Sequence, residues 1–119
     1  MDIERVVSDL QREFPGKSIV CVPKEHPREV IAELGKVAES TSAAVAIIDR
    51  GPKHVHRATT ETYVVETGQL RLHLQIDLEP GDCFRIEPGW VHWSEGQATR
   101  VLAISTPPWK PEDYILCED

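Results

Sequence analysis

Residues 51–68 read GPKHVHRATTETYVVETG, and two histidines and a glutamate lie close together in this strand-forming stretch. Side chains two positions apart in a strand face the same side, so His54 and His56 are predicted to point inward together. Glu61 falls on the opposite parity of a straight strand. A bend across residues 57–60 is therefore predicted, because it would return the Glu61 carboxylate to the two imidazoles.

A second stretch, residues 81–92, reads GDCFRIEPGWVH. Turn signals at Gly81-Asp82 and Pro88-Gly89 place His92 at the start of a new strand, where it can face the same cavity. Three imidazoles and one carboxylate suit a borderline divalent ion such as Fe, Mn, Ni, Co or Zn. Such a set usually leaves coordination positions open to water or substrate.

The two stretches resemble the two motifs of the cupin superfamily. The first motif runs His-x-His, a short gap, Glu, six residues and Gly, and its matches here are His54, His56, Glu61 and Gly68. The second motif is matched by Gly81, Gly89 and His92. Two positions depart from it: Glu87 stands where the family has proline, and Gly96 where it has asparagine. The resemblance covers residues 42–108, and the tail PPWKPEDYIL also looks like that of small single-domain cupins.

Resemblance to a small, cupin-2-like single-domain cupin implies an all-β fold, the cupin double-stranded β-helix or jelly-roll-like barrel. It also implies that one divalent metal ion is held by His54, His56, Glu61 and His92. The length of 119 residues fits one domain. We expect an N-terminal helix and strand within residues 1–40, the conserved barrel motifs within 42–108, and a C-terminal tail over 109–119.

Hydrophobic spacing predicts a short helix over residues 2–13 with Asp2 as N-cap, followed by many short strands separated by Gly/Pro turns. Residues 27–39 fit both a helix and a strand, and we favour a strand through Leu34. The tail TPPWKPED is too proline-rich for a sheet interior. The other strands are predicted at residues 18–22, 42–49, 60–66, 70–76, 83–86, 91–94 and 100–105.

The composition restricts the partners. A formal net charge of -7 argues against nucleic acid or an anionic membrane. No apolar run is long enough to cross a bilayer, and the charged start MDIERVVSDLQREF has no signal core, so a cytoplasmic location is expected. Three scattered cysteines predict no disulfide framework: Cys21 and Cys83 are expected to be buried thiols, and Cys117 to be more exposed.

Five further residues are candidates for a substrate pocket. They are Tyr63, Arg71, His73, Arg85 and Trp93. Tyr63 shares the face of Glu61 and is favoured as a cavity wall, with core packing as the alternative. For Arg71, His73 and Gln75 a solvated sheet face is favoured over a position at the barrel mouth. The indoles of Trp90, Trp93 and Trp109 fit packing or a dimer interface, and alternatively a platform for a flat ligand.

Two classes of function follow. The first is a metal-dependent enzyme acting on a small polar substrate that is sugar-like, a hydroxy-carbonyl compound or a carboxylate, as an isomerase or a dioxygenase. The second is a non-catalytic module that binds a small ligand such as a sugar. Neither motif contains an obvious catalytic base, although Tyr63 or His73 could serve. A homodimer is expected, because an isolated barrel of this size would expose its sheet edges.

Overall fold

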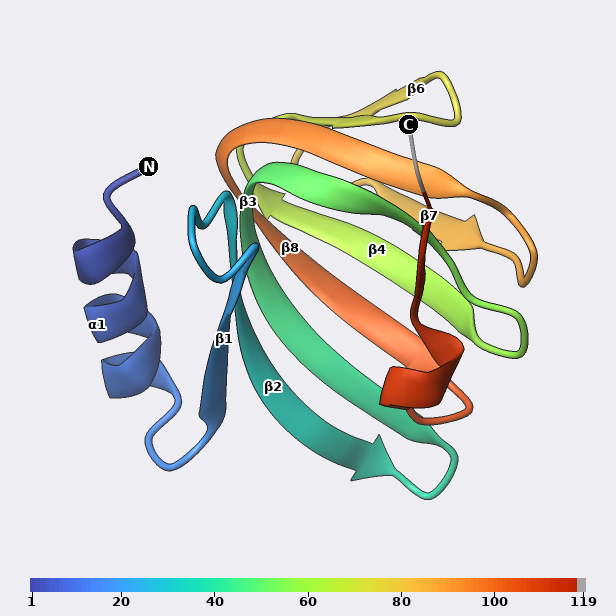
Figure 1. Ribbon diagram of the computed structural model, residues 1–119, viewed down its shortest axis with the longest axis horizontal. Coiled ribbons are helices and arrows are strands. Elements are labelled where there is room, and N and C mark those ends of the chain that lie inside the picture. The colour runs from blue at the N-terminus through green and yellow to red at the C-terminus, as the bar shows by residue number, and fades with distance from the viewer. Residues whose placement is uncertain (118–119) are drawn as a thin grey trace.

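The structure is a computed structural model that describes residues 1–117, in which one α-helix precedes a set of antiparallel strands (Figure 1). The predicted all-β fold with a short N-terminal helix is confirmed. The elements are α1 (Ile3–Glu13), β1 (Ser18–Val22), β2 (Glu29–Ala38), β3 (Thr41–Val55), β4 (Thr60–Thr67), β5 (Leu70–Leu72), β6 (Ile76–Leu78), β7 (Cys83–Ile86), β8 (His92–Thr106), a 3-10 turn (Pro111–Asp113) and β9 (Ile115–Leu116).

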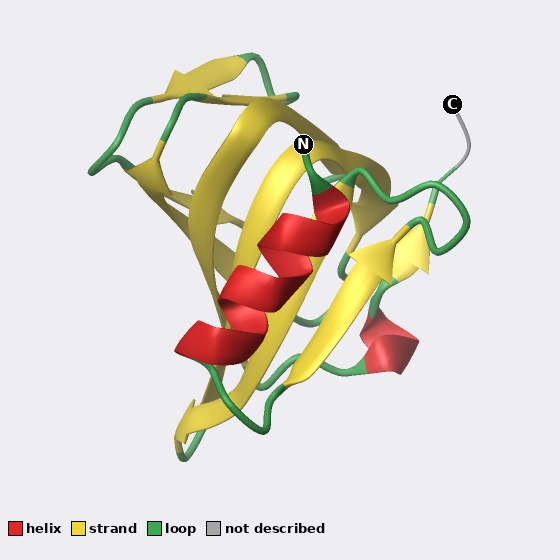
Figure 2. Ribbon diagram, turned by 90° about the vertical axis from the view of Figure 1, so that its left-hand side faces the viewer, coloured by secondary structure: helices red, strands yellow, loops and turns green. Residues whose placement is uncertain are grey.

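Two long strands, β3 and β8, form the centre of the sheet, whose order is β1-β2-β3-β8-β4-β7. All of these neighbours pair antiparallel. The sheet is strongly curved, and strand β5 of the β5–β6 hairpin pairs with β8 (Figures 1 and 2). Because β8 pairs with β3 on one side and β4 on the other, the two stretches with the histidines and the glutamate are brought together.

Alternating side chains divide the apolar residues of β3 between two layers. Ala46 and Ile48 face the inner cluster with Val65 and Val101, whereas Ile47 faces the outer cluster. Helix α1 covers this outer face (Figure 2). It buries Leu10 against β2 and β3, and the predicted N-cap is confirmed, because the carboxylate of Asp2 accepts a hydrogen bond from the backbone N–H of Arg5.

The central strands are longer than the sequence pattern predicts. Residues 27–39 contain strand β2, as favoured, and it continues past Leu34 because Gly35, at φ +76°, sits at a register shift rather than ending the strand. Strand β3 does not end at residue 49 as predicted, but continues through Arg50, Gly51 and Pro52 to Val55. The strand passes through register shifts there, and it keeps its pairing with β8. The two strands predicted at residues 91–94 and 100–105 are one strand, β8.

The single strand predicted over residues 70–76 is wrong. This segment forms the β5–β6 hairpin, with Leu70 opposite Leu78 and Leu72 opposite Ile76. The chain reverses where Gln75 has φ 66°. Leucines at alternate positions fit a straight strand and also the first arm of a hairpin, so alternation alone could not locate the turn.

The cysteines depart in part from expectation. Cys83 is exposed, not buried, because it begins β7 at the edge of the sheet. Cys21 and Cys117 are both half-buried. Within residues 1–117, no helix has the length and apolar character needed to span a membrane.

Candidate metal centre

Three strands contribute three of the four candidate ligands, and the fourth follows the end of β3. His54 lies near the end of β3, Glu61 near the start of β4, and His92 at the start of β8, while His56 directly follows β3. The bend predicted between His56 and Glu61 is present, since β3 ends at Val55 and β4 begins at Thr60. The sequence parity therefore identified a true change of direction in the chain.

The tail holds this bend in place. The carboxylate of Asp113 accepts hydrogen bonds from the backbone N–H groups of Arg57 at 3.0 Å, Ala58 at 3.1 Å and Thr59 at 2.9 Å. One side chain therefore accepts hydrogen bonds from three successive backbone N–H groups. The bend that brings Glu61 to the imidazoles thus depends on a residue far along the chain.

The four side chains converge on one point. The distances from Oε1 of Glu61 to the Nε2 atoms of His54, His56 and His92 are 3.9, 3.6 and 3.4 Å. One ligand atom from each side chain lies within 4.8 Å of all the others, and all four residues are buried. Because metal–ligand bonds to nitrogen and oxygen are about 2 Å long, a set of this span can surround a single ion.

Backbone carbonyls orient all three rings. The Nδ1 atom of His54 lies 2.8 Å from the carbonyl oxygen of Pro52, that of His56 lies 3.0 Å from that of Asp113, and that of His92 lies 2.9 Å from that of Trp90. A carbonyl only accepts, so each Nδ1 carries the proton and donates. In the neutral ring, Nε2 then presents a lone pair toward Glu61.

Lone pairs therefore face one another inside a buried cluster. Within residues 1–117, no hydrogen-bond partner is found for Nε2 of His56, Nε2 of His92 or Oε1 of Glu61. Buried polar atoms are normally paired, and the group that satisfies several acceptors at once is a cation. The donor set and its orientation thus fit a divalent metal ion.

The pKa shifts favour the metal-binding forms of His54 and Glu61. Burial, together with the charge of His92, lowers the pKa of His54 to about 4. Burial opposes ionisation of Glu61, but His56 and His92 outweigh it and hold the pKa of this carboxyl below its usual value. Burial also opposes protonation of His56, yet Glu61 raises the pKa of that ring. Because Glu61 makes His56 more basic, protons compete with a metal ion for Nε2 of that ring.

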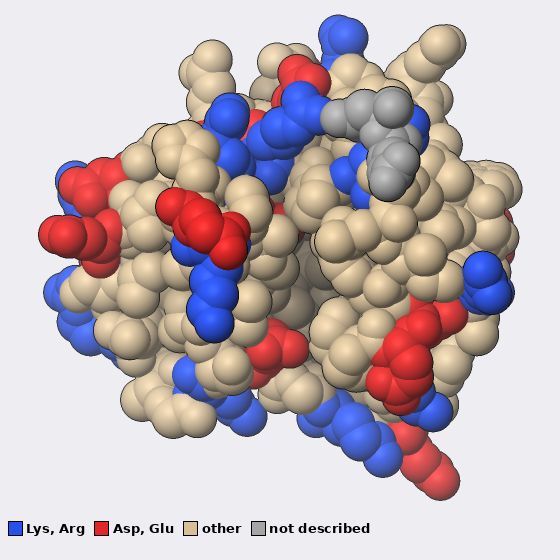
Figure 3. All heavy atoms as spheres, viewed as in Figure 1, with Lys and Arg blue, Asp and Glu red and all other residues tan. Residues whose placement is uncertain are grey.

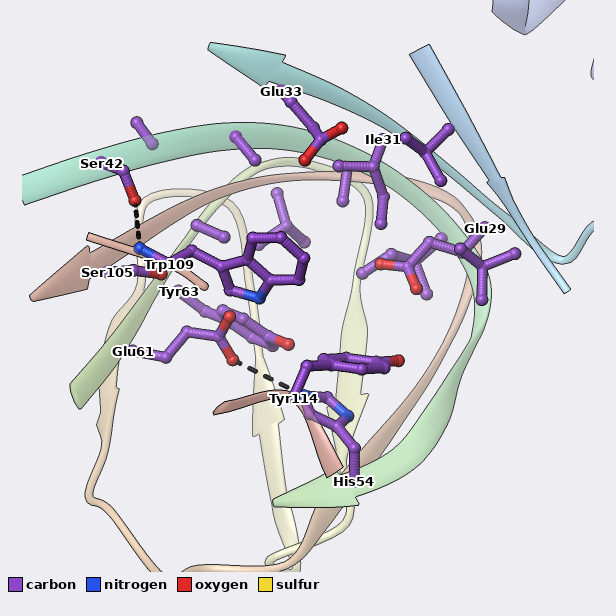
Figure 4. A pocket seen from close by; sticks show the side chains of 18 of the residues that line it. Glu29, Ile31, Glu33, Ser42, His54, Glu61, Tyr63, Ser105, Trp109 and Tyr114 are labelled. Carbon is purple, nitrogen blue, oxygen red and sulfur yellow. Dashed lines mark hydrogen bonds and ion pairs between the residues drawn. The ribbon is translucent and has the colours of Figure 1, made fainter. Parts of the chain in front are cut away.

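A cavity of about 390 Å³ lies beside the cluster, lined in part by His54 and Glu61. Figure 3 shows a hollow in the middle of this face, walled mainly by uncharged residues. Figure 4 shows the polar groups around it. Much of the wall is aliphatic and comes from Val20, Val22, Ile31, Ala43, Ala44, Ala46, Ile48, Val101 and Ala103.

Two tyrosines line the cavity with their hydroxyl groups protonated. Tyr63 is a cavity wall, as favoured from its parity with Glu61, and it is also part of the inner core cluster. Burial and the charge of Glu61 raise its pKa, so it is suited to donate a hydrogen bond and not to act as the base. Burial also raises the pKa of Tyr114, whose ring stacks on His54 at a centroid distance of 4.6 Å.

Four of the predicted pocket residues do not line this cavity: Arg71, His73, Arg85 and Trp93. Leu70 and Leu72 fill the inward positions of β5, so Arg71 between them is exposed. It pairs with Asp77. Exposed Arg85 pairs with Glu87 in the same way. His73 and Trp93 stack on each other at 4.4 Å outside the cavity, so His73 cannot serve as a base there.

The sequence interpretation missed four residues of the site. The sequence shows Trp109 only as one of three indoles. Tyr114 and Asp113 lie in a proline-rich tail, which is not expected in a sheet interior. Glu29 lines the cavity from the start of β2. It falls in the segment whose helix or strand character was open, so the direction of its side chain could not be inferred.

Comparison with solved structures identifies the fold. A Streptomyces protein, Pac13, solved with uridine and described as a nucleoside dehydratase, superposes with a TM-score of 0.72 at 15% identity over 86% of this chain and 85% of its own. A Klebsiella pneumoniae protein with a double-stranded β-helix domain gives 0.65 at 18% identity over 77% and 86%. A cupin-like Thermotoga maritima protein gives 0.57 at 20% identity over 66% and 68%.

These likenesses concern the fold. Comparison with protein-family models and with curated protein sequences finds no match. The predicted cupin double-stranded β-helix is confirmed by the structural neighbours and by the antiparallel curled sheet.

Proposed function

We propose that this chain, which has the cupin fold, is a mononuclear metal-dependent enzyme acting on a small substrate. His54, His56, Glu61 and His92 would hold one divalent ion. One observation carries the proposal: three imidazole Nε2 atoms and a carboxylate converge in one buried cluster. The structural neighbour solved with uridine supports a small-molecule ligand in this fold.

The ion would act as a Lewis acid that polarises an oxygen of the substrate. Its donor set of three nitrogens and one oxygen suits Fe, Mn, Ni, Co or Zn. Isomerisation and dioxygenation are the reaction types we favour. The protein would contribute a cavity that opens beside the ligands and two hydroxyl donors, Tyr63 and Tyr114, in its wall. Its aliphatic wall would exclude water from the substrate.

Metal binding is tested with protein purified without a metal-chelating tag. Elemental analysis and calorimetric titration with Mn, Fe, Co, Ni and Zn should give one equivalent per chain. Glu61→Gln and His92→Ala should abolish or strongly weaken binding. His26→Ala is the matched control, since His26 is exposed and outside the cluster. Protein that binds none of these ions, or for which both cluster variants bind like the unmodified chain, would contradict the proposal.

Catalysis is separated from simple binding by turnover. A substrate screen with the identified metal restored should show product formation that is lost in Glu61→Gln. Ligands that raise the melting temperature but are recovered unchanged would favour the alternative, a non-catalytic binding module.

We also propose a homodimer. Strand β1 lies at one edge of the sheet, and Val20 within it is 36% exposed. Unpaired edges of this kind favour association with a second copy. Light scattering at micromolar concentration should give twice the monomer mass, and a monomeric mass would refute the dimer.

A further inference from the structure

The charged side chains around the cavity all have the same sign. Of the residues that line it, the acidic ones are Glu29, Glu33 and Glu61, and none is a lysine or an arginine. Glu61 belongs to the metal cluster. The other two carboxyl groups have no part in that cluster, so their presence in the wall calls for a separate explanation.

Glu29 is the more telling of the two. It opens β2 opposite Ile48 of β3, is only 9% exposed, and points into the cavity (Figure 4). Among the described residues, no hydrogen bond or ion pair is found for its carboxyl group.

A buried carboxyl group without a partner is costly to ionise. Burial, and to a smaller extent the charge of Glu61, raise the pKa of Glu29 to about 8. An incoming cation would remove this cost by supplying the missing charge and hydrogen bonds. An incoming anion would add to it.

The other residues of the cavity wall indicate what kind of molecule would fit beside Glu29. Aliphatic side chains, among them Ile31, Ala46 and Ile48, make up much of the surface. The aromatic rings of Trp109 and Tyr114 also line it, and aromatic faces attract organic cations. Apolar area, ring faces and a buried acid together favour a positively charged group on an apolar body.

We propose that the cavity binds a compact organic cation, a molecule with an apolar body about the size of one ring and a single ammonium group that Glu29 receives. The inference rests on the proposed function in that the ligand would occupy the cavity beside the metal cluster. It narrows the substrate class, because carboxylates and phosphorylated sugars would meet Glu29 and Glu33 without any basic side chain among the lining residues.

The test uses three probes of one shape that differ in charge: cyclohexylamine, cyclohexanol and cyclohexanecarboxylate. Binding is measured at neutral pH by calorimetry and by the shift of the Trp109 indole N–H signal, assigned with Trp109→Phe. Chelator-treated and metal-loaded protein are compared. The amine should bind the unmodified chain at least about tenfold more tightly than the alcohol, which is 1.4 kcal/mol, and the carboxylate should bind weakest to the chelator-treated form.

Glu29→Gln should bring the amine down to the affinity of the alcohol. Glu66→Gln should change nothing, since Glu66 pairs with Arg100 outside the cavity. Equal affinities for amine and alcohol, or no binding of any probe at millimolar concentration, would overturn the inference. The order of the three probe affinities in the unmodified chain tests the proposed ligand class even if Glu29→Gln does not fold.

The two proposals fail separately. If the chain binds metal but does not prefer the amine, only the proposal that the cavity binds an organic cation is contradicted. If the chain prefers the amine but binds no metal, only the proposed metal-dependent function is contradicted.

Discussion

Replacing Glu29 by glutamine should change how stability depends on pH. The substitution keeps the shape of the side chain and removes its titration. In the folded protein burial, with a contribution from Glu61, raises the pKa of this carboxyl from 4.5 to about 8. The folded chain therefore holds a proton on Glu29 over a range in which the unfolded chain has lost it.

The sign follows from this difference in bound protons. The contribution of Glu29 to the free energy of unfolding is complete below pH 4.5 and is lost as the pH rises toward 8. At 1.36 kcal/mol per pKa unit, the shift corresponds to roughly 5 kcal/mol. Between pH 5 and pH 8.5, the unmodified chain should lose roughly 4 kcal/mol relative to Glu29→Gln.

Urea unfolding of chelator-treated protein at several pH values measures this difference directly. Other titrating groups are common to both chains and largely cancel. Glu13→Gln is the control, because a hydrogen bond from Arg100 lowers the pKa of Glu13, so this variant should show a small trend of the opposite sign. A difference between Glu29→Gln and the unmodified chain that stays constant from pH 5 to pH 8.5 would refute the reasoning.

Three further substitutions test other parts of the structure. Asp113→Ala releases the bend before Thr60, so it should lower the free energy of unfolding by about 1–2 kcal/mol in urea unfolding. It should also weaken metal binding roughly tenfold in calorimetry. An unchanged metal affinity would contradict this. Gly96→Ala should cost about 1–3 kcal/mol in the same unfolding assay, since its Cβ would lie 2.9 Å from the carbonyl oxygen of Ile48. Arg71→Ala, at an exposed pair, should leave the melting temperature and probe binding unchanged.

The cluster of candidate ligands could be predicted in part, because three of its four residues lie within residues 54–61, and His92 joins them through the second cupin-like stretch. His54 and His56 are two positions apart and face the same side of a strand. Glu61 can reach them only if the chain bends between residues 57 and 60. The departure of Gly96 from the motif has a structural reason as well. The space beside its Cα is filled by Thr99 and by the backbone of β3, so a side chain would collide there.

The cavity could not be predicted because its wall is assembled by distant pairing. Glu29 reaches it only through the register of β2 on β3, and Tyr114 only through the tail. Arg71 and His73, candidates for the pocket, lie outside the cavity, in line with the solvated face favoured for them over the barrel mouth. Alternating residues show that two faces exist, but the β5–β6 turn and its pairing with β8 decide which face meets the cavity.

The hydrogen bond from His56 to the backbone of Asp113 joins residues 57 positions apart. Chains are synthesised from the N-terminus and begin folding in that order. His54, His56, Glu61 and His92 are therefore all made before the segment that orients His56 and clamps the bend. In a nascent chain, the four candidate ligands would not yet be held in their final positions. Stable metal binding would therefore require that the tail has packed against the barrel.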